Sequence, residues 1–244
     1  MSSALICLKP NPSAEIRLVC LPHAGGSAQI FQDWTRRLPL WIELWAVELP
    51  GRGRRWGEQP IAALSQLVPD LSAAIADEIK KPFALFGHSM GGLIAFELAH
   101  TLQQQAAPLG LYVSAAEAPQ SKPSKPPIHG LPTPEFIAEL RRYDGTPAAI
   151  LENEEMMELL LPTLRSDFSL LETYEYRPGQ MVSCPIVAFS GREDDIVSYE
   201  AMQQWAHVTT ASFLQHDVVG DHFFVQTPDF VERLLMCLTQ MIRG

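Results

Sequence analysis

The sequence has 244 residues, of which 47% are hydrophobic and 19% are charged, the balance of a folded globular protein rather than a disordered one. That length predicts one domain, or one domain carrying an insertion. The formal net charge of −10 argues against a nucleic-acid-binding protein, which needs a basic surface. The chain has no apolar run of about 18 residues and no basic start before an apolar stretch, so we expect a cytoplasmic protein.

Short apolar runs alternate with longer helical patterns along most of the chain. The runs predicted to form strands are 16–21, 44–49, 83–86, 111–114, 185–190 and 212–218. Several are apolar throughout, which is typical of strands buried on both faces of a parallel sheet. Apolar residues recur every three or four positions from 64 to 79, and a last helix is expected to begin at Thr227–Pro228–Asp229. The alternation predicts an α/β fold with helices on both faces of a mostly parallel sheet.

One long segment, 117–176, interrupts the alternation. A minimal connection between the strands at 111–114 and 185–190 would need far fewer residues. The segment begins with prolines among serines and lysines and continues with helical patterns at 134–143 and 152–174. We interpret it as a helical lid inserted into a single domain that spans residues 1–244. The alternative is that it simply adds helices to the core.

The string Gly87-His88-Ser89-Met90-Gly91 matches G-x-S-x-G, the nucleophile elbow of the α/β-hydrolase fold. In this turn a strand passes sharply into a helix at the serine, and the two glycines leave room for the crossing chain. The required context is present, because Pro82–Phe86 is predicted to be a strand and Gly92–Leu102 a helix. Ser89 is therefore the predicted nucleophile, and a tight turn without chemistry is the alternative.

A serine hydroxyl needs an adjacent base, and seven histidines compete for that role. In the α/β-hydrolase fold the order along the chain is serine, acid, histidine. His222 follows the last predicted strand, so it is the expected general base. His88 is expected to be structural, because its side chain should point away from that of Ser89 at the sharp turn.

The acid that orients the histidine is expected in the loop 191–197, directly after a predicted strand. Three acids compete there: Glu193, Asp194 and Asp195. Glu193 is disfavoured because it is longer and lies nearer the end of the strand. The chemistry of the residues does not choose between the two aspartates.

The tetrahedral intermediate of acyl transfer needs two backbone N–H donors. Met90, directly after the nucleophile, is expected to supply one of them. The second is expected from the loop Leu21–Ser27, where Gly25 and Gly26 allow the backbone to approach an oxyanion closely. An ordinary turn is the alternative for these two glycines.

Four motifs taken together resemble the type II thioesterases, which are discrete proofreading enzymes of polyketide synthases and nonribosomal peptide synthetases. The motifs are LPHAGGS at Leu21–Ser27, LPGR at Leu49–Arg52, FGHSMGG at Phe86–Gly92 and GDHFF at Gly220–Phe224. They occur in the family's order, and the resemblance extends from about Arg17 to the C-terminus. Two departures are Gly92, where alanine is also common, and Asp221, where glycine is more usual.

The resemblance implies a catalytic triad of Ser89, Asp194 and His222, with oxyanion donors at Ala24 and Met90. It also implies that the enzyme hydrolyses acyl groups from the phosphopantetheine arm of an acyl or peptidyl carrier protein. The family needs no cofactor and no metal.

The resemblance also favours Asp194 over Asp195. In the family, the acid stands three positions after a glycine and three before a hydrophobic residue, as Asp194 stands between Gly191 and Val197.

Two other functions stay open on the same fold. One is a medium-chain fatty acyl thioesterase, or a small-molecule esterase or acyltransferase. The other is a noncatalytic binding protein, which the complete set of triad residues argues against. We expect a monomer that binds neither nucleic acid nor membrane.

Docking of the carrier protein is expected to use a local basic patch near the mouth of the pocket, or mostly apolar contacts. Carrier proteins are generally acidic, and the chain itself carries a charge of −10, so overall attraction cannot bring the two together. The favoured clusters are Arg52, Arg54 and Arg55, or Lys122 and Lys125.

Overall fold

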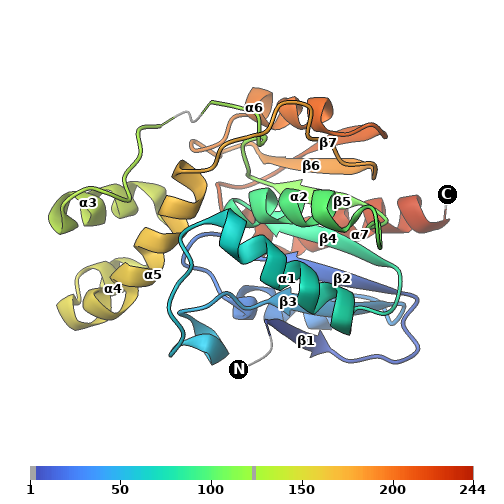
Figure 1. The fold of residues 1–244 in the computed structure, drawn as a ribbon, viewed down its shortest axis with the longest axis horizontal. Helices are drawn as coiled ribbons and strands as arrows, with labels where there is room; N and C mark the ends of the chain where they lie inside the picture. Colours follow the sequence, from blue (N-terminus) through green and yellow to red (C-terminus); the bar gives the residue numbers. More distant parts are fainter. Residues whose placement is uncertain (1–3, 123–124, 244) are drawn as a thin grey trace.

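The computed structural model describes residues 4–122 and 125–243. Within these ranges, seven strands form one sheet in the order β1-β3-β2-β4-β5-β6-β7 (Figure 1). They are β1 (Leu5–Lys9), β2 (Ile16–Leu21), β3 (Ile42–Val47), β4 (Phe83–His88), β5 (Leu111–Ser114), β6 (Ile186–Gly191) and β7 (Phe213–Val218). β1 pairs antiparallel with β3, and all other neighbours are parallel. The predicted α/β fold with a mostly parallel sheet is confirmed.

Two strands differ from the sequence-based prediction. β1 was not predicted, because its five residues form a short edge strand defined by pairing with distant β3. β3 begins at Ile42 and ends at Val47, whereas the apolar run predicted a strand over 44–49. Leu49 is buried in the loop beyond the strand, so its hydrophobicity reflects burial and not strand pairing.

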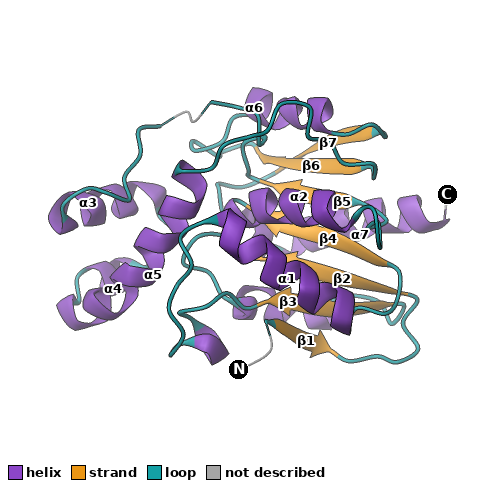
Figure 2. Cartoon of the chain, viewed as in Figure 1, coloured by secondary structure: helices purple, strands orange, loops and turns teal. Residues whose placement is uncertain are grey.

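Helices cover both faces of the sheet (Figure 2). One face carries α1 (Leu64–Glu78), α2 (Met90–Leu102) and α6 (Tyr199–Gln203), and the other carries the 3₁₀ segment η1 (Ala28–Arg36) and α7 (Pro228–Arg243). Val19 and Leu21 of β2 pack toward the first layer. Leu18 and Cys20 pack toward the second, as the two-residue period of a strand requires. None of the helices in the described ranges is long and apolar enough to span a membrane.

The predicted start of the last helix is confirmed. α7 begins at Pro228, and the Thr227 hydroxyl accepts a hydrogen bond from the Phe230 N–H at 3.4 Å. A threonine cap followed by proline in the first turn explains why the helix begins here.

The long segment between β5 and β6 contains α3 (Thr133–Tyr143), α4 (Ala148–Leu151) and α5 (Glu154–Glu172). In Figure 1 these helices lie beyond the carboxyl ends of the parallel strands, at one end of the sheet. They have an apolar cluster of their own, formed by Ile128, Phe136, Leu140, Leu151, Met157, Leu164 and Phe168. Leu170 of α5, by contrast, belongs to the cluster that α1 and α2 form on the sheet. The helical layer is therefore a separate packing unit that α5 joins to the core.

Candidate functional site

Ser89 lies at the sharp turn between β4 and α2. Its φ of 52° is in the left-handed region, which a residue with a side chain rarely adopts. A Cβ added to Gly87 would lie 2.1 Å from the Gly91 carbonyl oxygen, and one added to Gly91 would lie 2.2 Å from the Leu21 carbonyl oxygen. Both glycines are thus required by close backbone contacts, as the elbow motif predicts.

His222 lies after β7, and its two ring nitrogens contact the other two candidate triad residues. Nε2 is 3.1 Å from the Ser89 hydroxyl, and Nδ1 is 3.0 Å from Oδ2 of Asp194. Because a carboxylate only accepts hydrogen bonds, Nδ1 carries the proton and its N–H donates a hydrogen bond to Asp194. The unprotonated Nε2 then faces Ser89 Oγ, where it can accept the serine proton.

Asp194 is held by more than the histidine. Its Oδ1 accepts hydrogen bonds from the Ile196 and Val197 amides at 2.8 and 3.0 Å. Burial acts to raise the pKa of Asp194, but hydrogen bonds from His222 and from the two amides outweigh it, so the pKa lies below its usual value. The carboxylate therefore stays ionised beside the imidazole.

The structure distinguishes between the three acids of this loop. The Asp194 side chain is fully buried against His222, whereas Glu193 and Asp195 are exposed. The loop packs closely on the histidine loop, since a Cβ added to Gly191 would lie 2.8 Å from the carbonyl oxygens of both Gly220 and Asp221. Of the three, only Asp194 is thus placed to orient His222.

The two candidate oxyanion donors border Ser89 from different elements. Met90 is the first residue of α2, and N–H groups in the first turn of a helix have no acceptor within that helix. Ala24 lies in the loop after β2 and lines a small cavity together with Ser89 and His222. The neighbouring Gly25 has φ of +76°, a conformation that favours glycine.

His88 is buried next to the site, where the centre of its ring lies 5.5 Å from that of His222. Its Nδ1 lies 2.8 Å from the Ser114 hydroxyl. Burial, together with the nearby rings of His222 and His23, lowers the pKa of His88 well below its usual value. It is therefore a neutral, structural histidine, as the sequence predicts.

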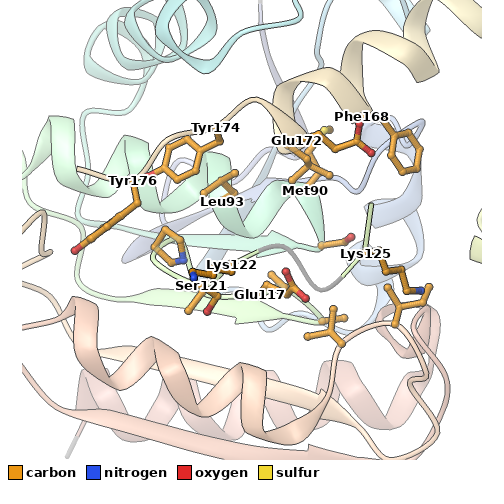
Figure 3. Close-up of a pocket in the computed structure, with 18 of the residues that line it drawn as sticks. Met90, Leu93, Glu117, Ser121, Lys122, Lys125, Phe168, Glu172, Tyr174 and Tyr176 are labelled. Carbon is orange, nitrogen blue, oxygen red and sulfur yellow. The ribbon is translucent and has the colours of Figure 1, made fainter. Parts of the chain in front are cut away.

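Two cavities meet at Ser89. The larger has a volume of about 350 Å³ and runs between α2, the loop after β5 and α5 (Figure 3). The smaller, about 60 Å³, lies toward His23 and Phe223. Phe168 and Leu171 of α5 line both cavities, so the inserted helices form a wall of the candidate site.

Arg52 contradicts one expectation from the sequence. Its side chain is buried and forms a bidentate ion pair with Asp167 of α5, with both N–O distances 2.7 Å. It therefore cannot serve as a surface docking residue. Arg55 is paired with Glu58 at 2.6 Å, and only Arg54 of this cluster is exposed without such an ion pair among the described residues.

Sequence reasoning missed Asp167, although a signal was present. Asp167 lies on the apolar face of its helix, three residues after Leu164 and four before Leu171. An acid in such a position must be paired when it is buried. The sequence does not name its partner, because Arg52 is 115 residues away.

Within residues 4–122 and 125–243, no group of three or more His, Cys, Asp or Glu side chains is placed to hold a metal ion. The candidate site that the structure brings together consists of Ser89, His222 and Asp194, with Ala24 and Met90 at its edge.

Two known proteins resemble the chain over nearly its whole length. The gramicidin S biosynthesis protein GrsT of Aneurinibacillus migulanus is 42% identical over 229 residues, which cover 93% of this chain and 90% of that protein. The medium-chain S-acyl fatty acid synthase thioesterase of Rattus norvegicus is 33% identical, over 92% of this chain and 87% of that protein.

Solved structures with the same fold include two type II thioesterases. BorB, from the borrelidin biosynthetic cluster, has a TM-score of 0.87 and 34% identity, and the match covers 99% of this chain and 98% of that one. YbtT, from the yersiniabactin NRPS/PKS pathway, has a TM-score of 0.85 and 30% identity, with coverage of 98% and 97%. The family model for the thioesterase domain matches residues 16–240. The chain therefore belongs to the thioesterase family of α/β-hydrolase fold, whose members hydrolyse thioesters.

Proposed function

We propose that this protein is a type II thioesterase that hydrolyses acyl groups from the phosphopantetheine arm of acyl or peptidyl carrier proteins in a polyketide or nonribosomal peptide pathway. The observation that carries the proposal is the hydrogen-bonded chain from Ser89 through His222 to Asp194, at the junction of two cavities. The similarity to BorB and YbtT supports the pathway, since both are named as type II thioesterases of biosynthetic pathways.

In the proposed mechanism, Ser89 Oγ attacks the thioester carbonyl while His222 Nε2 takes the hydroxyl proton. The amides of Ala24 and Met90 stabilise the oxyanion, and Asp194 stabilises the imidazolium. The C–S bond breaks, and His222 gives the proton to the departing thiolate. Water then attacks the acyl-enzyme with His222 again as base, which releases the carboxylic acid and restores Ser89. Every group in this scheme comes from one chain, so a monomer suffices.

We also propose that segment 117–176 is a lid on a single domain spanning 1–244. Its helices have their own apolar cluster and contribute Phe168 and Leu171 to both cavities. A cover built this way would enclose the acyl group and set the shape of the acyl site.

A medium-chain fatty acyl thioesterase is the second candidate function. It is favoured by the 33% identity to the rat enzyme and by the apolar side chains that line the larger cavity, including Leu93 and Val197.

The two functions are distinguished by comparing kcat/KM for one acyl group on a carrier protein, on coenzyme A and on a nitrophenyl ester. A preference of about 10-fold or more for the carrier-bound group supports the proposal, because remote binding energy then contributes to turnover. Equal values for carrier protein and coenzyme A favour the second candidate. Ser89→Ala is the control, and it should lower the rate by about 10⁴-fold or more. A protein whose Ser89 is not labelled by a fluorophosphonate would not be a serine hydrolase.

A further inference from the structure

The peptide that carries the Ala24 N–H is oriented by a hydrogen bond on its other side. The His23 carbonyl of this peptide accepts a hydrogen bond from the Gly26 N–H at 2.9 Å. In a trans peptide the N–H and the carbonyl point in opposite directions. The Ala24 N–H therefore points away from Gly26, and its direction depends on where Gly26 is held.

Gly25 and Gly26 are held by two side chains from distant parts of the chain. The Gly25 N–H donates to Oδ2 of Asp167 at 2.7 Å. Arg52 Nη1 donates to the Gly26 carbonyl at 3.2 Å. The Ala24 carbonyl, in turn, accepts a hydrogen bond from Nδ1 of His23 at 2.9 Å. The loop is thus held at successive peptide groups.

The two side chains that hold the loop also orient each other. The Arg52 guanidinium makes two hydrogen bonds of 2.7 Å to the Asp167 carboxylate, and the two side chains are 6% and 2% exposed. A planar guanidinium paired in this way fixes the plane of the carboxylate, which a lysine could not do. Neither charge is available to solvent, so the role of the pair lies inside the protein.

The helix that carries Asp167 also forms the wall of the substrate cavities. Phe168, the next residue, lines both of them. Leu164, one turn earlier, lines the smaller cavity and packs on the loop, since a Cβ added to Gly25 would lie 2.8 Å from its Cδ2. Through two adjacent residues, α5 thus contacts the loop His23–Gly26, here called the oxyanion loop, and lines both cavities.

We propose that Arg52 and Asp167 are positioning residues for the oxyanion hole: they hold Gly25 and Gly26 so that the Ala24 N–H points at the developing oxyanion. This inference rests on the proposed function, because it takes Ala24 as an oxyanion donor. It assigns α5 a second task besides covering the site. One helix carries both Phe168, which lines the cavities, and Asp167, which holds the oxyanion loop. The position of the cavity wall relative to the oxyanion loop is therefore fixed.

The test compares Arg52→Lys and Asp167→Asn with the unmodified enzyme on an acyl-N-acetylcysteamine thioester. We expect kcat to fall about 10- to 100-fold while KM changes less than about 3-fold, since an oxyanion contact acts in the transition state. Two inhibitors distinguish a loss of oxyanion stabilisation from a general loss of substrate binding. A trifluoromethyl ketone forms a tetrahedral oxyanion on Ser89 and should lose affinity in parallel with kcat. An unreactive amide analogue of the substrate should bind as before.

Removing one charge could unfold the protein by leaving the other buried alone. The double variant Arg52→Met/Asp167→Leu removes both charges and should fold, yet show the same loss of kcat. Arg17→Gln is the matched control: Arg17 forms a largely buried ion pair with Glu43 at 2.6 Å at the amino end of β2, away from the oxyanion loop. Its kcat should stay within about 2-fold of the unmodified enzyme.

An unchanged kcat in folded variants would overturn the inference, as would equal loss of affinity for the ketone and the amide. Failure of the proposed function looks different. The unmodified protein would then not hydrolyse the thioester, or Ser89→Ala would retain the activity.

Discussion

His222 Nδ1 lies 3.0 Å from Oδ2 of Asp194, and the other carboxylate oxygen of Asp194 is occupied by two backbone amides. The amides fix the carboxylate in the loop, so the histidine ring is held in one orientation by a rigid partner. This relationship distinguishes Asp194 from the neighbouring Asp195, whose side chain is exposed.

Asp194→Asn is expected to lower kcat by on the order of 10²- to 10⁴-fold, because an amide at this position stabilises the wrong tautomer and not the imidazolium. Asp195→Asn is the matched control and should stay within about 2-fold, since exposed substitutions away from the site have small effects. Steady-state kinetics on a small thioester measures both. The reverse order of effects would show that Asp195 is the acid.

Tyr174 is expected to limit acyl length. In Figure 3, Tyr174 and Tyr176 lie at the end of the larger cavity away from Lys125. The Tyr174 hydroxyl donates to Oε1 of Glu97 at 2.6 Å, which holds the ring in place. Tyr174→Ala opens this end, and kcat/KM for longer acyl groups should rise about 10-fold relative to short ones.

Tyr174→Phe is the control for this prediction, because it removes the hydrogen bond and keeps the ring. The acyl-length preference of Tyr174→Phe should match that of the unmodified enzyme. The measurement is kcat/KM over a series of acyl thioesters that differ in chain length. An identical profile for Tyr174→Ala would show that the acyl group does not reach this end.

The burial of Arg52 leaves Lys122 and Lys125 as the favoured docking residues. Both are exposed at the larger cavity, and Lys125 Nζ lies 4.8 Å from the centre of the Tyr143 ring. The double substitution Lys122→Glu/Lys125→Glu should raise KM for an acidic acyl-carrier protein on the order of 10-fold at low salt, because steering depends on charge. KM for a small thioester should not change.

Arg36→Glu is the matched charge reversal for this test, since Arg36 is exposed on η1, on the other face of the sheet from α2. It should leave both KM values unchanged. An equal response of the carrier and small substrates to the lysine substitutions would place docking elsewhere.

The buried histidines predict a pH-dependent stability. Burial lowers the pKa of His88 well below its usual value of 6.5. Below pH 6.5 the His88 side chain therefore binds a proton in the unfolded state but not in the folded state. The free energy of unfolding should therefore fall with decreasing pH, by about 1.4 kcal/mol per pH unit for one such group. Urea denaturation from pH 7 to 5.5 measures the slope.

His88→Asn should flatten this slope, because an amide can still hydrogen-bond Ser114 but does not titrate. His207→Gln is the control, since His207 is exposed. The prediction is wrong if His88→Asn and the unmodified protein lose stability with the same slope.

The proposed lid should exchange its amide hydrogens unevenly. α5 is tied to the core by the Arg52–Asp167 pair and by the hydrogen bond from the Thr163 hydroxyl to the Gly51 carbonyl at 2.9 Å. α3 and α4 are joined to the rest mainly through their own apolar cluster. Hydrogen exchange should therefore be faster in α3 and α4 than in α5, and an acyl-phosphonate bound to Ser89 should slow it. Uniformly slow exchange across 117–176, unchanged by the phosphonate, would mean that these are ordinary core helices.

The elbow at Ser89, the order of the candidate triad and most helices were predictable from the sequence. Each depends on local rules: glycines where backbones meet, apolar residues every three or four positions in a helix, and a cap at Thr227. The four sequence motifs together indicated the thioesterase family. The match of the family model to residues 16–240 confirms it.

The chemistry of the loop left Asp194 and Asp195 open, and the family resemblance favoured Asp194. Only the tertiary structure shows that the Asp194 side chain turns toward His222 and that Arg52 is buried against Asp167 of α5. Adjacent acids in a loop have the same chemistry, and which one turns inward depends on how that loop packs against the loop of His222. A basic residue in a loop is normally solvated, and Arg52 is buried only because Asp167, 115 residues away, compensates its charge. Local pattern determines which element forms, whereas side-chain direction and charge burial depend on partners that only folding brings together.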